Sequence, residues 1–178
     1  MIEPSSAVRH DDRGLTLIEL CIVILVLAIL MVTGVAALLR ARMAANESSA
    51  IGSLRTINNA QFAYASACGS GQYATSLPIL ATVPPGNSQG YLSEDLGSSA
   101  TPQRSGYNYR MLGGAGGAAG TPDCNGTMTQ TKYYATAAPV TQGQTGDRAF
   151  ATNQGGAVYQ AQATPPDEPF DPPDQLAQ

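Results

Sequence analysis

The 178-residue chain contains no tryptophan and a single histidine, His10, which lies close to the N-terminus. The rest of the chain therefore lacks the imidazole that a Ser–His or Cys–His catalytic relay or a histidine-ligated metal site requires. The three cysteines, Cys21, Cys68 and Cys124, form no C-x-x-C pair, which argues against a zinc ribbon or a thioredoxin-type redox site. We predict no catalytic residue, no metal site and no cofactor.

Charged side chains are scarce as well, at 12% of residues, against roughly 25% in typical globular chains. The formal net charge is -4, and the basic residues after position 14 form no run. This distribution argues against nucleic-acid binding through a basic surface. The length allows one modest domain.

What the chain does have is an apolar run of 25 residues, Leu15–Leu39. As a helix it would extend roughly 37 Å, enough to cross the hydrocarbon core of a membrane. A cleavable secretory signal would be shorter and would end in an A-x-A-like site, and no such site follows Leu39. We predict a membrane-embedded helix, whose orientation stays open because arginines flank both of its ends.

Residues 40–68 continue the helix with an amphipathic pattern. One face is defined by a spacing of four, three, four, three and four residues: Ala50, Leu54, Ile57, Gln61, Tyr64 and Cys68. Arg55, Asn58 and Asn59 are predicted to lie off this face. The pattern indicates that the second half of the helix packs on a small domain.

Residues 69–162 are predicted to form that domain, a small antiparallel β-sheet of three or four strands with long loops. The strand candidates are rich in Tyr, Thr and Val: 104–112, 132–138, 147–152 and 157–161. The segment 153–156 is a hairpin turn candidate, and 77–80 and 91–96 are expected to form short helical turns. The fold class is therefore α+β. The tail, 163–178, holds five prolines and is predicted to be disordered.

Glu19 is the only ionisable side chain in the apolar run. A carboxylate near the centre of a bilayer costs roughly 2.5–3.5 kcal/mol, so it indicates a functional role with a cationic partner, although an acid at the membrane edge would cost less. No Lys or Arg of the run serves as that partner. A cut between Gly14 and Leu15 would create an α-amino group in the same layer, and the amine of a neighbouring subunit suits Glu19 at least as well.

The segment 13–20, RGLTLIEL, resembles the processing motif of type IV prepilins and type II secretion pseudopilins. The resemblance implies that a prepilin peptidase cuts after Gly14 and methylates the amine of Leu15, with the leader 1–14 in the cytoplasm. It also implies that Glu19 sets subunit register during assembly. Two features depart from the family: Leu15 replaces the usual Phe, and the apolar run lacks the proline that kinks many pilin helices.

The resemblance implies a pilin-like fold and a structural, non-enzymatic subunit of a type IV pilus or related filament. Expected partners are copies of the chain or other pilins, the prepilin peptidase, the inner-membrane platform of the pilus or secretion system, and the membrane before assembly. The expected location is the bacterial inner membrane, then a periplasmic or extracellular filament. The alternatives are a minor pseudopilin of a type II secretion system and a singly anchored periplasmic binding domain that does not polymerise.

With the leader 1–14 in the cytoplasm, Cys68 and Cys124 would both face an oxidising compartment. Cys68 lies at the end of the amphipathic face and Cys124 in a loop, so a disulfide between them would tie the sheet region to the helix end. The alternative is two separate buried thiols. Cys21 is too far along the helix to join them and is interpreted as a small apolar residue.

Overall fold

The computed structural model describes Gly14, residues 16–167 and residues 175–177, without the side chains of residues 32–36 and 175. The chain divides into two units, one that ends at Leu38 and one that begins at Leu39. Within the predicted leader only Gly14 is described, and within the predicted tail 168–174 and 178 lie outside the described residues.

The first helix, α1 (Leu17–Ala67), runs for 51 residues. Its sequence contains no proline, which would remove a backbone hydrogen bond from the helix interior. The helix ends where the N–H groups of Cys68 and Gly69 both donate to the carbonyl of Tyr64, at 2.8 Å each. A side chain at Gly69 would stand 2.2 Å from the backbone oxygen of Gln72, so only glycine permits this close turn.

In the first unit, α1 exposes large apolar side chains on all sides. The exposed fraction lies between 47% and 82% for every Leu, Ile, Val and Met from Leu17 to Met31. Among the residues that the structure describes, no helical stretch is both long and apolar enough to cross a membrane. The predicted span, 15–39, includes Leu15 and the side chains of 32–36, which lie outside the described set.

In the second unit the larger sheet has six antiparallel strands in the order β1-β2-β5-β6-β7-β8. Their bounds are β1 (Gln103–Arg104), β2 (Tyr107–Gly113), β5 (Tyr133–Pro139), β6 (Arg148–Asn153), β7 (Val158–Gln162) and β8 (Gln175–Leu176). A separate pair is formed by β3 (Ala119–Pro122) and β4 (Met128–Gln130). The α+β class is confirmed, and the sheet is larger than the predicted three or four strands because two-residue edge strands, β1 and β8, extend it.

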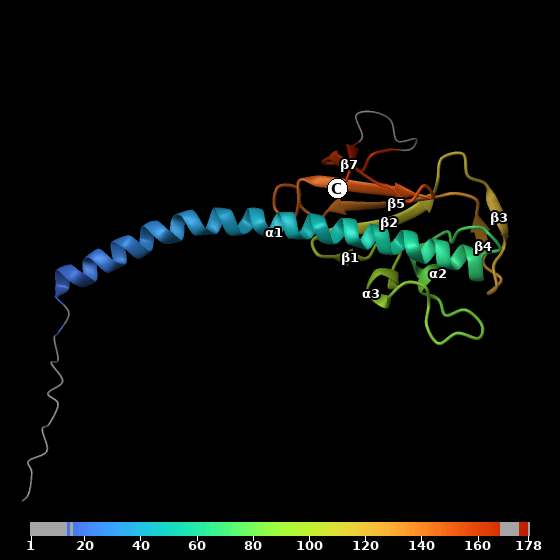
Figure 1. Cartoon of the computed structure of the whole chain (residues 1–178), viewed down its shortest axis with the longest axis horizontal. Helices are drawn as coiled ribbons and strands as arrows, with labels where there is room; N and C mark the ends of the chain where they lie inside the picture. The colour runs from blue at the N-terminus through green and yellow to red at the C-terminus, as the bar shows by residue number, and fades with distance from the viewer. Residues whose placement is uncertain (1–13, 15, 168–174, 178) are drawn as a thin grey trace, which may run out of the picture. The chain divides into compact units, whose positions relative to one another are not determined.

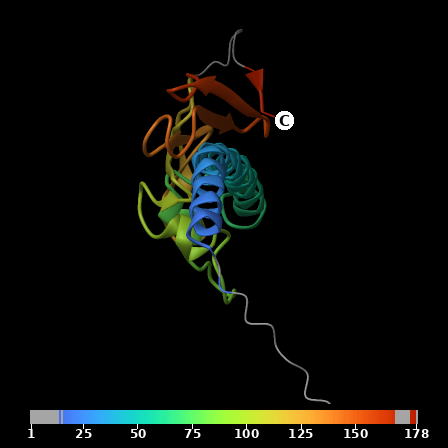
Figure 2. The ribbon, with the colours of Figure 1, turned by 90° about the vertical axis from the view of Figure 1, so that its left-hand side faces the viewer.

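The core of the second unit lies between the sheet and the end of α1. Figures 1 and 2 show the sheet along one side of this part of the helix. The predicted helix face is confirmed, since all six of its residues are buried: Ala50, Leu54, Ile57, Gln61, Tyr64 and Cys68. From β2, the alternating Tyr107, Tyr109 and Met111 pack into the same cluster.

Asn58 corrects the sequence-based interpretation, because its side chain is buried rather than off the packed face. Its amide donates to the hydroxyl of Thr152 at 2.8 Å and to the carbonyl of Gly156 at 3.0 Å, and it accepts from the hydroxyl of Tyr133 at 2.8 Å. The buried face of the helix is therefore wider than a single stripe and includes a polar position whose hydrogen bonds are met by three segments of the sheet.

The remaining elements are short. The predicted helical turns are confirmed by α2 (Leu77–Ala81) and α3 (Glu94–Gly97), whose leucines Leu77, Leu80 and Leu96 are buried. The predicted hairpin turn at 153–156 joins β6 to β7, with the N–H of Gly156 donating to the carbonyl of Asn153. Within the expected tail, β8 pairs with β7, and the N–H of Ala177 donates to the carbonyl of Val158.

Candidate functional site

The predicted cleavage site begins at Gly14, which is exposed. A side chain added at Gly14 would meet no described atom within 4 Å. Packing within the described part of the chain therefore gives no reason for glycine at this position. Leu15, the predicted first residue after the cut, lies outside the described residues.

Thr16 and Glu19 together form the start of α1. The hydroxyl of Thr16 accepts from the N–H of Glu19 at 3.2 Å, and the carbonyl of Thr16 accepts from the N–H of Leu20. Thr at the N-cap and Glu three residues later have the spacing of a capping box. The negative charge of Glu19 in the first turn also interacts favourably with the helix dipole. Two residues of the motif thus have a local structural role in starting the helix.

Glu19 has no ion-pair partner within the part of the chain that the structure describes. Its neighbours Ile18 and Leu20 are 68% and 53% exposed, and exposed apolar side chains continue through the following turns. The first unit therefore presents one carboxylate on an otherwise apolar helical surface. Such a surface can recognise a cation from outside the chain, and its apolar surroundings would strengthen that attraction.

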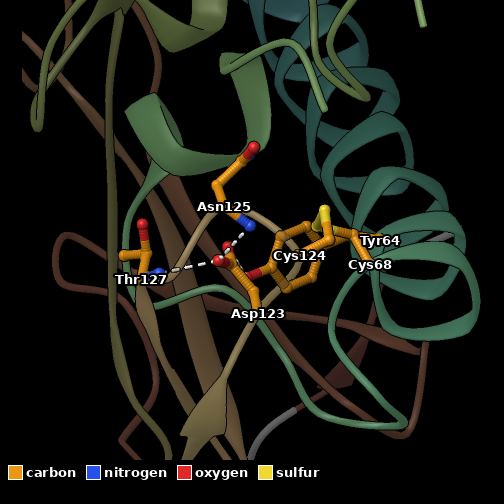
Figure 3. Close-up of a disulfide and its surroundings, with 6 residues drawn as sticks. All are labelled: Tyr64, Cys68, Asp123, Cys124, Asn125 and Thr127. Carbon is orange, nitrogen blue, oxygen red and sulfur yellow. Dashed lines mark hydrogen bonds between the residues drawn. A yellow bond between two sulfur atoms is a disulfide. The ribbon is translucent and has the colours of Figure 1, made fainter. Parts of the chain in front are cut away.

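The second predicted site, the Cys68–Cys124 disulfide, is formed, which confirms the pairing. The N–H of Cys124 donates to the carbonyl of Cys68 at 3.0 Å. Next to it, the hydroxyl of Tyr64 donates to Asp123 Oδ2 at 2.7 Å, as Figure 3 places these groups side by side. The disulfide region therefore has three connections between the end of α1 and the loop that joins β3 to β4.

The Tyr64–Asp123 contact also changes the acidity of both groups. Burial, followed by the bond to Asp123 and its negative charge, raises the pKa of the Tyr64 hydroxyl far above its usual value. Burial favours protonation of Asp123, but the hydrogen bond from Tyr64 and the loop N–H groups outweigh it and hold the pKa of this carboxyl below its ordinary value. At neutral pH the pair is therefore a phenol bound to a carboxylate.

The structure reveals a charged contact that the sequence analysis did not anticipate. Glu47, on α1, is 7% exposed, and Arg148 on β6 donates to its Oε2 through Nε at 2.8 Å and Nη2 at 2.6 Å. The backbone N–H groups of Asp147 and Arg148 donate to Oε1. The available signal was the position of Glu47 as the only acid of the amphipathic segment 40–68, but its partner is 101 residues away.

The described residues contain no group of three His, Cys, Asp or Glu side chains placed to hold a metal ion. Cys21, in the first unit, is an exposed free cysteine. The structure thus brings Cys68 and Cys124 together, places Gly14 and Glu19 around the start of α1, and leaves Leu15 undescribed.

Comparison with known families identifies one match. Residues 9–35 match the family described as the prokaryotic N-terminal methylation motif. This motif is the signature of type IV pilins and pseudopilins, so the resemblance of the segment around Gly14 and Glu19 is confirmed. Neither the curated proteins nor the solved structures include one with significant similarity to the chain.

Proposed function

We propose that this chain is a structural subunit of a type IV pilus or pilus-like filament, cut after Gly14 and polymerised through the apolar part of α1. The observation that carries the proposal is the combination found in the first unit. A single carboxylate, Glu19, lies on a helix whose large apolar side chains are exposed on all sides, within a matched methylation motif. A soluble monomer rarely leaves such a surface uncovered.

The apolar surface has two successive environments in this proposal. Before assembly, residues 15–39 lie in the inner membrane, with the leader in the cytoplasm and the second unit in the periplasm. After assembly, the same side chains pack against those of neighbouring copies in the filament core. Lipid tails are as apolar as Leu, so close packing and polar pairing, rather than loss of water, drive helices together.

Glu19 supplies register in this scheme. After the cut, the N-methylated amine of Leu15 carries the positive charge that the described part of the chain does not offer to Glu19. Leu15 and Glu19 are four residues apart, so helical geometry would keep the amine about one turn away from the carboxylate of its own subunit. The amine of a neighbouring subunit is therefore at least as suitable a partner. Pairing in a medium of low dielectric penalises any stagger that leaves the carboxylate alone.

A minor pseudopilin of a type II secretion system is the second candidate, because the matched motif is the signature of both groups. That subunit would use the same cut and the same helix packing, in a short periplasmic filament. The two candidates differ in the assembly that the subunit enters. Purified surface filaments that contain the chain support the pilus, and its restriction to a secretion complex supports the pseudopilus.

Intact mass and N-terminal sequencing of the membrane-extracted chain test the proposal. We expect loss of 14 residues, from 178 to 164, and one added methyl group on the new terminus. Gly14→Val should stay uncut, because a side chain there obstructs the peptidase, while Gly52→Ala, an exposed helix position, should be cut normally. A native chain that keeps residues 1–14 and does not polymerise would instead identify a singly anchored domain.

A further inference from the structure

The loop between β3 and β4 is a tight turn held by Asp123. The N–H of Gly126 donates to the carbonyl of Asp123 at 3.0 Å. The carboxylate Oδ1 of Asp123 accepts from the N–H of Asn125 at 2.8 Å and from the N–H of Thr127 at 2.7 Å, which Figure 3 draws as dashed lines. Gly126 has a φ of +79°, a value that glycine adopts at no steric cost.

Asn125 and Gly126 are the single Asn-Gly dipeptide of the sequence. Asn125 is exposed, and its side-chain amide makes no hydrogen bond to any described residue. Two other asparagines, Asn46 and Asn58, donate through their amides to Thr145 and to Thr152 and Gly156. A side chain at Gly126 would meet no described atom within 4 Å, so no neighbouring group crowds the Cα of this residue.

We propose that Asn125 is a modification site at which the chain deamidates spontaneously, with water as the co-reactant. The backbone nitrogen of Gly126 attacks Cγ of Asn125, a C–N bond forms to close a five-membered succinimide, and ammonia leaves with the proton. Water then adds to one of the two ring carbonyls and opens the ring. The products are aspartate, or isoaspartate in which the backbone runs through the former side chain, and no oxidation state changes.

The same turn restrains the reaction. For the attack, the hydrogen bond from the Gly126 N–H to the carbonyl of Asp123 must break. The Gly126 nitrogen must then rotate toward the Asn125 side chain. The two bonds to Asp123 Oδ1 oppose that rotation, and Tyr64 holds Asp123 in place through Oδ2. Folding therefore slows a reaction that the sequence favours, and the disulfide at Cys124 holds the turn on its other side.

Deamidation of Asn125 would also weaken the turn between β3 and β4. Isoaspartate inserts one additional backbone atom between residues 125 and 126, which displaces the N–H groups that bond to Asp123. Either product also adds a negative charge two residues from Asp123, and like charges at that distance repel. Conversion of Asn125 thus loosens the loop that connects to the end of α1, independently of any role in a filament.

Peptide mass spectrometry of the full chain over time at mildly alkaline pH tests the proposal. We expect residues 111–132 to gain the mass difference between amide and acid and to split into two chromatographic forms, several-fold faster in urea with reductant than in the folded chain. Tyr64→Phe should accelerate the folded reaction, and Asn125→Gln, which would need a six-membered ring, should abolish it.

Two results would overturn the proposal. If another asparagine converts before Asn125 in the unfolded chain, the site is wrong. If the folded and unfolded chains convert Asn125 at the same rate, the turn does not restrain it. Circular dichroism of Tyr64→Phe separates a local effect from unfolding of the variant, and a Tyr64→Phe chain that folds without acceleration excludes the contribution of Tyr64.

Discussion

At the scale of the residue, two buried amides determine how α1 meets the sheet. Gln61 is fully buried and pairs with the backbone of Ala74, accepting from its N–H at 2.9 Å and donating to its carbonyl at 3.0 Å. Asn58, one turn earlier, binds groups of β5, β6 and the β6–β7 turn. Fully satisfied polar groups in a low dielectric penalise any shift that breaks them. The Asn58 bonds therefore favour one register of the helix on the sheet, and the Gln61 bonds fix the segment after the helix against α1.

We expect Gln61→Leu to destabilise the second unit by about 1–3 kcal/mol. The variant leaves the buried N–H of Ala74 without its acceptor, while Gln130 still donates to the carbonyl of Ala74. Urea unfolding of the detergent-solubilised chain measures the loss. Asn59→Ala, at an exposed position of the same helix, should stay within about 0.5 kcal/mol of the native chain. Equal stability of both variants would show that the Gln61–Ala74 pairing contributes nothing.

Glu47 makes stability depend on pH. Burial favours its protonated form, but the hydrogen bond from Arg148, two backbone N–H groups and the positive charge of Arg148 together hold the pKa of Glu47 below its ordinary value of 4.5. A carboxyl with a lowered native pKa adds stability above its unfolded pKa and loses it as pH falls through its native pKa. Stability should therefore decline as the solution is acidified below about pH 4.5.

The corresponding variant is Glu47→Gln, which we expect to cost about 1–3 kcal/mol at neutral pH, within the range for hydrogen bonds to charged groups. The stability difference from the native chain should shrink on acidification, since both chains then lack the carboxylate. Thermal unfolding followed by circular dichroism at several pH values measures this. Glu94→Gln, on the exposed short helix α3, is the matched control. A stability difference between Glu47→Gln and the native chain that stays constant with pH would show that the Glu47 carboxylate is not its cause.

At the scale of the element, regular periodicity made most of the fold predictable. The four segments rich in Tyr, Thr and Val correspond to β2, β5, β6 and β7, and an uninterrupted helical pattern corresponds to α1. The pair β3–β4 was not predicted, because β3 lies in a Gly- and Pro-containing segment and has no buried face, with a burial pattern that is mostly exposed. Its strands are held by Gln72 and by the turn at Asp123, contacts that no local pattern encodes.

The disulfide connects two of these elements, the end of α1 and the β3–β4 loop. Its cysteines are 56 residues apart in sequence, and closing a loop of that size stabilises the chain by about 4 kcal/mol in the chain-entropy model. We expect the variant Cys68→Ser/Cys124→Ser to lose about that amount in urea unfolding under oxidising conditions.

Two comparisons sharpen this test. Dithiothreitol should lower the stability of the native chain to that of the double variant, and Cys21→Ser, at an exposed free cysteine, should leave it unchanged. If reduction and the double substitution both leave the unfolding midpoint unchanged, the disulfide does not contribute to stability. The hydrogen bonds from Tyr64 to Asp123 and from Cys124 to Cys68 would then hold the loop on the end of α1 without it.

At the scale of the whole molecule, the two units differ in how they treat their side chains. The second unit buries most of its large apolar side chains and pairs most of its buried polar groups, whereas the first unit leaves its described apolar side chains exposed. Buried tyrosines, leucines and alanines fill the core of residues 39–178. The first unit exposes its apolar side chains and presents a carboxylate without a described partner. The sequence identified this site from the motif, but the residues that the structure describes offer Glu19 no ion-pair partner. Under the proposed function, other copies of the chain would supply the missing partner of Glu19.

Glu19 is the residue that tests this dependence, and its two roles have separable consequences. We expect Glu19→Val to be cut and extracted with membranes but to enter filaments poorly, because the neighbouring amine would be buried without its counter-charge. The measurement is the ratio of the chain in sheared filaments to that in membranes. Glu19→Gln keeps a side chain suited to the capping box while removing the charge. If pairing with the amine sets register, Gln fails as Val does. If Gln assembles normally, the residue acts only in starting α1, and the register role assigned to its charge is wrong.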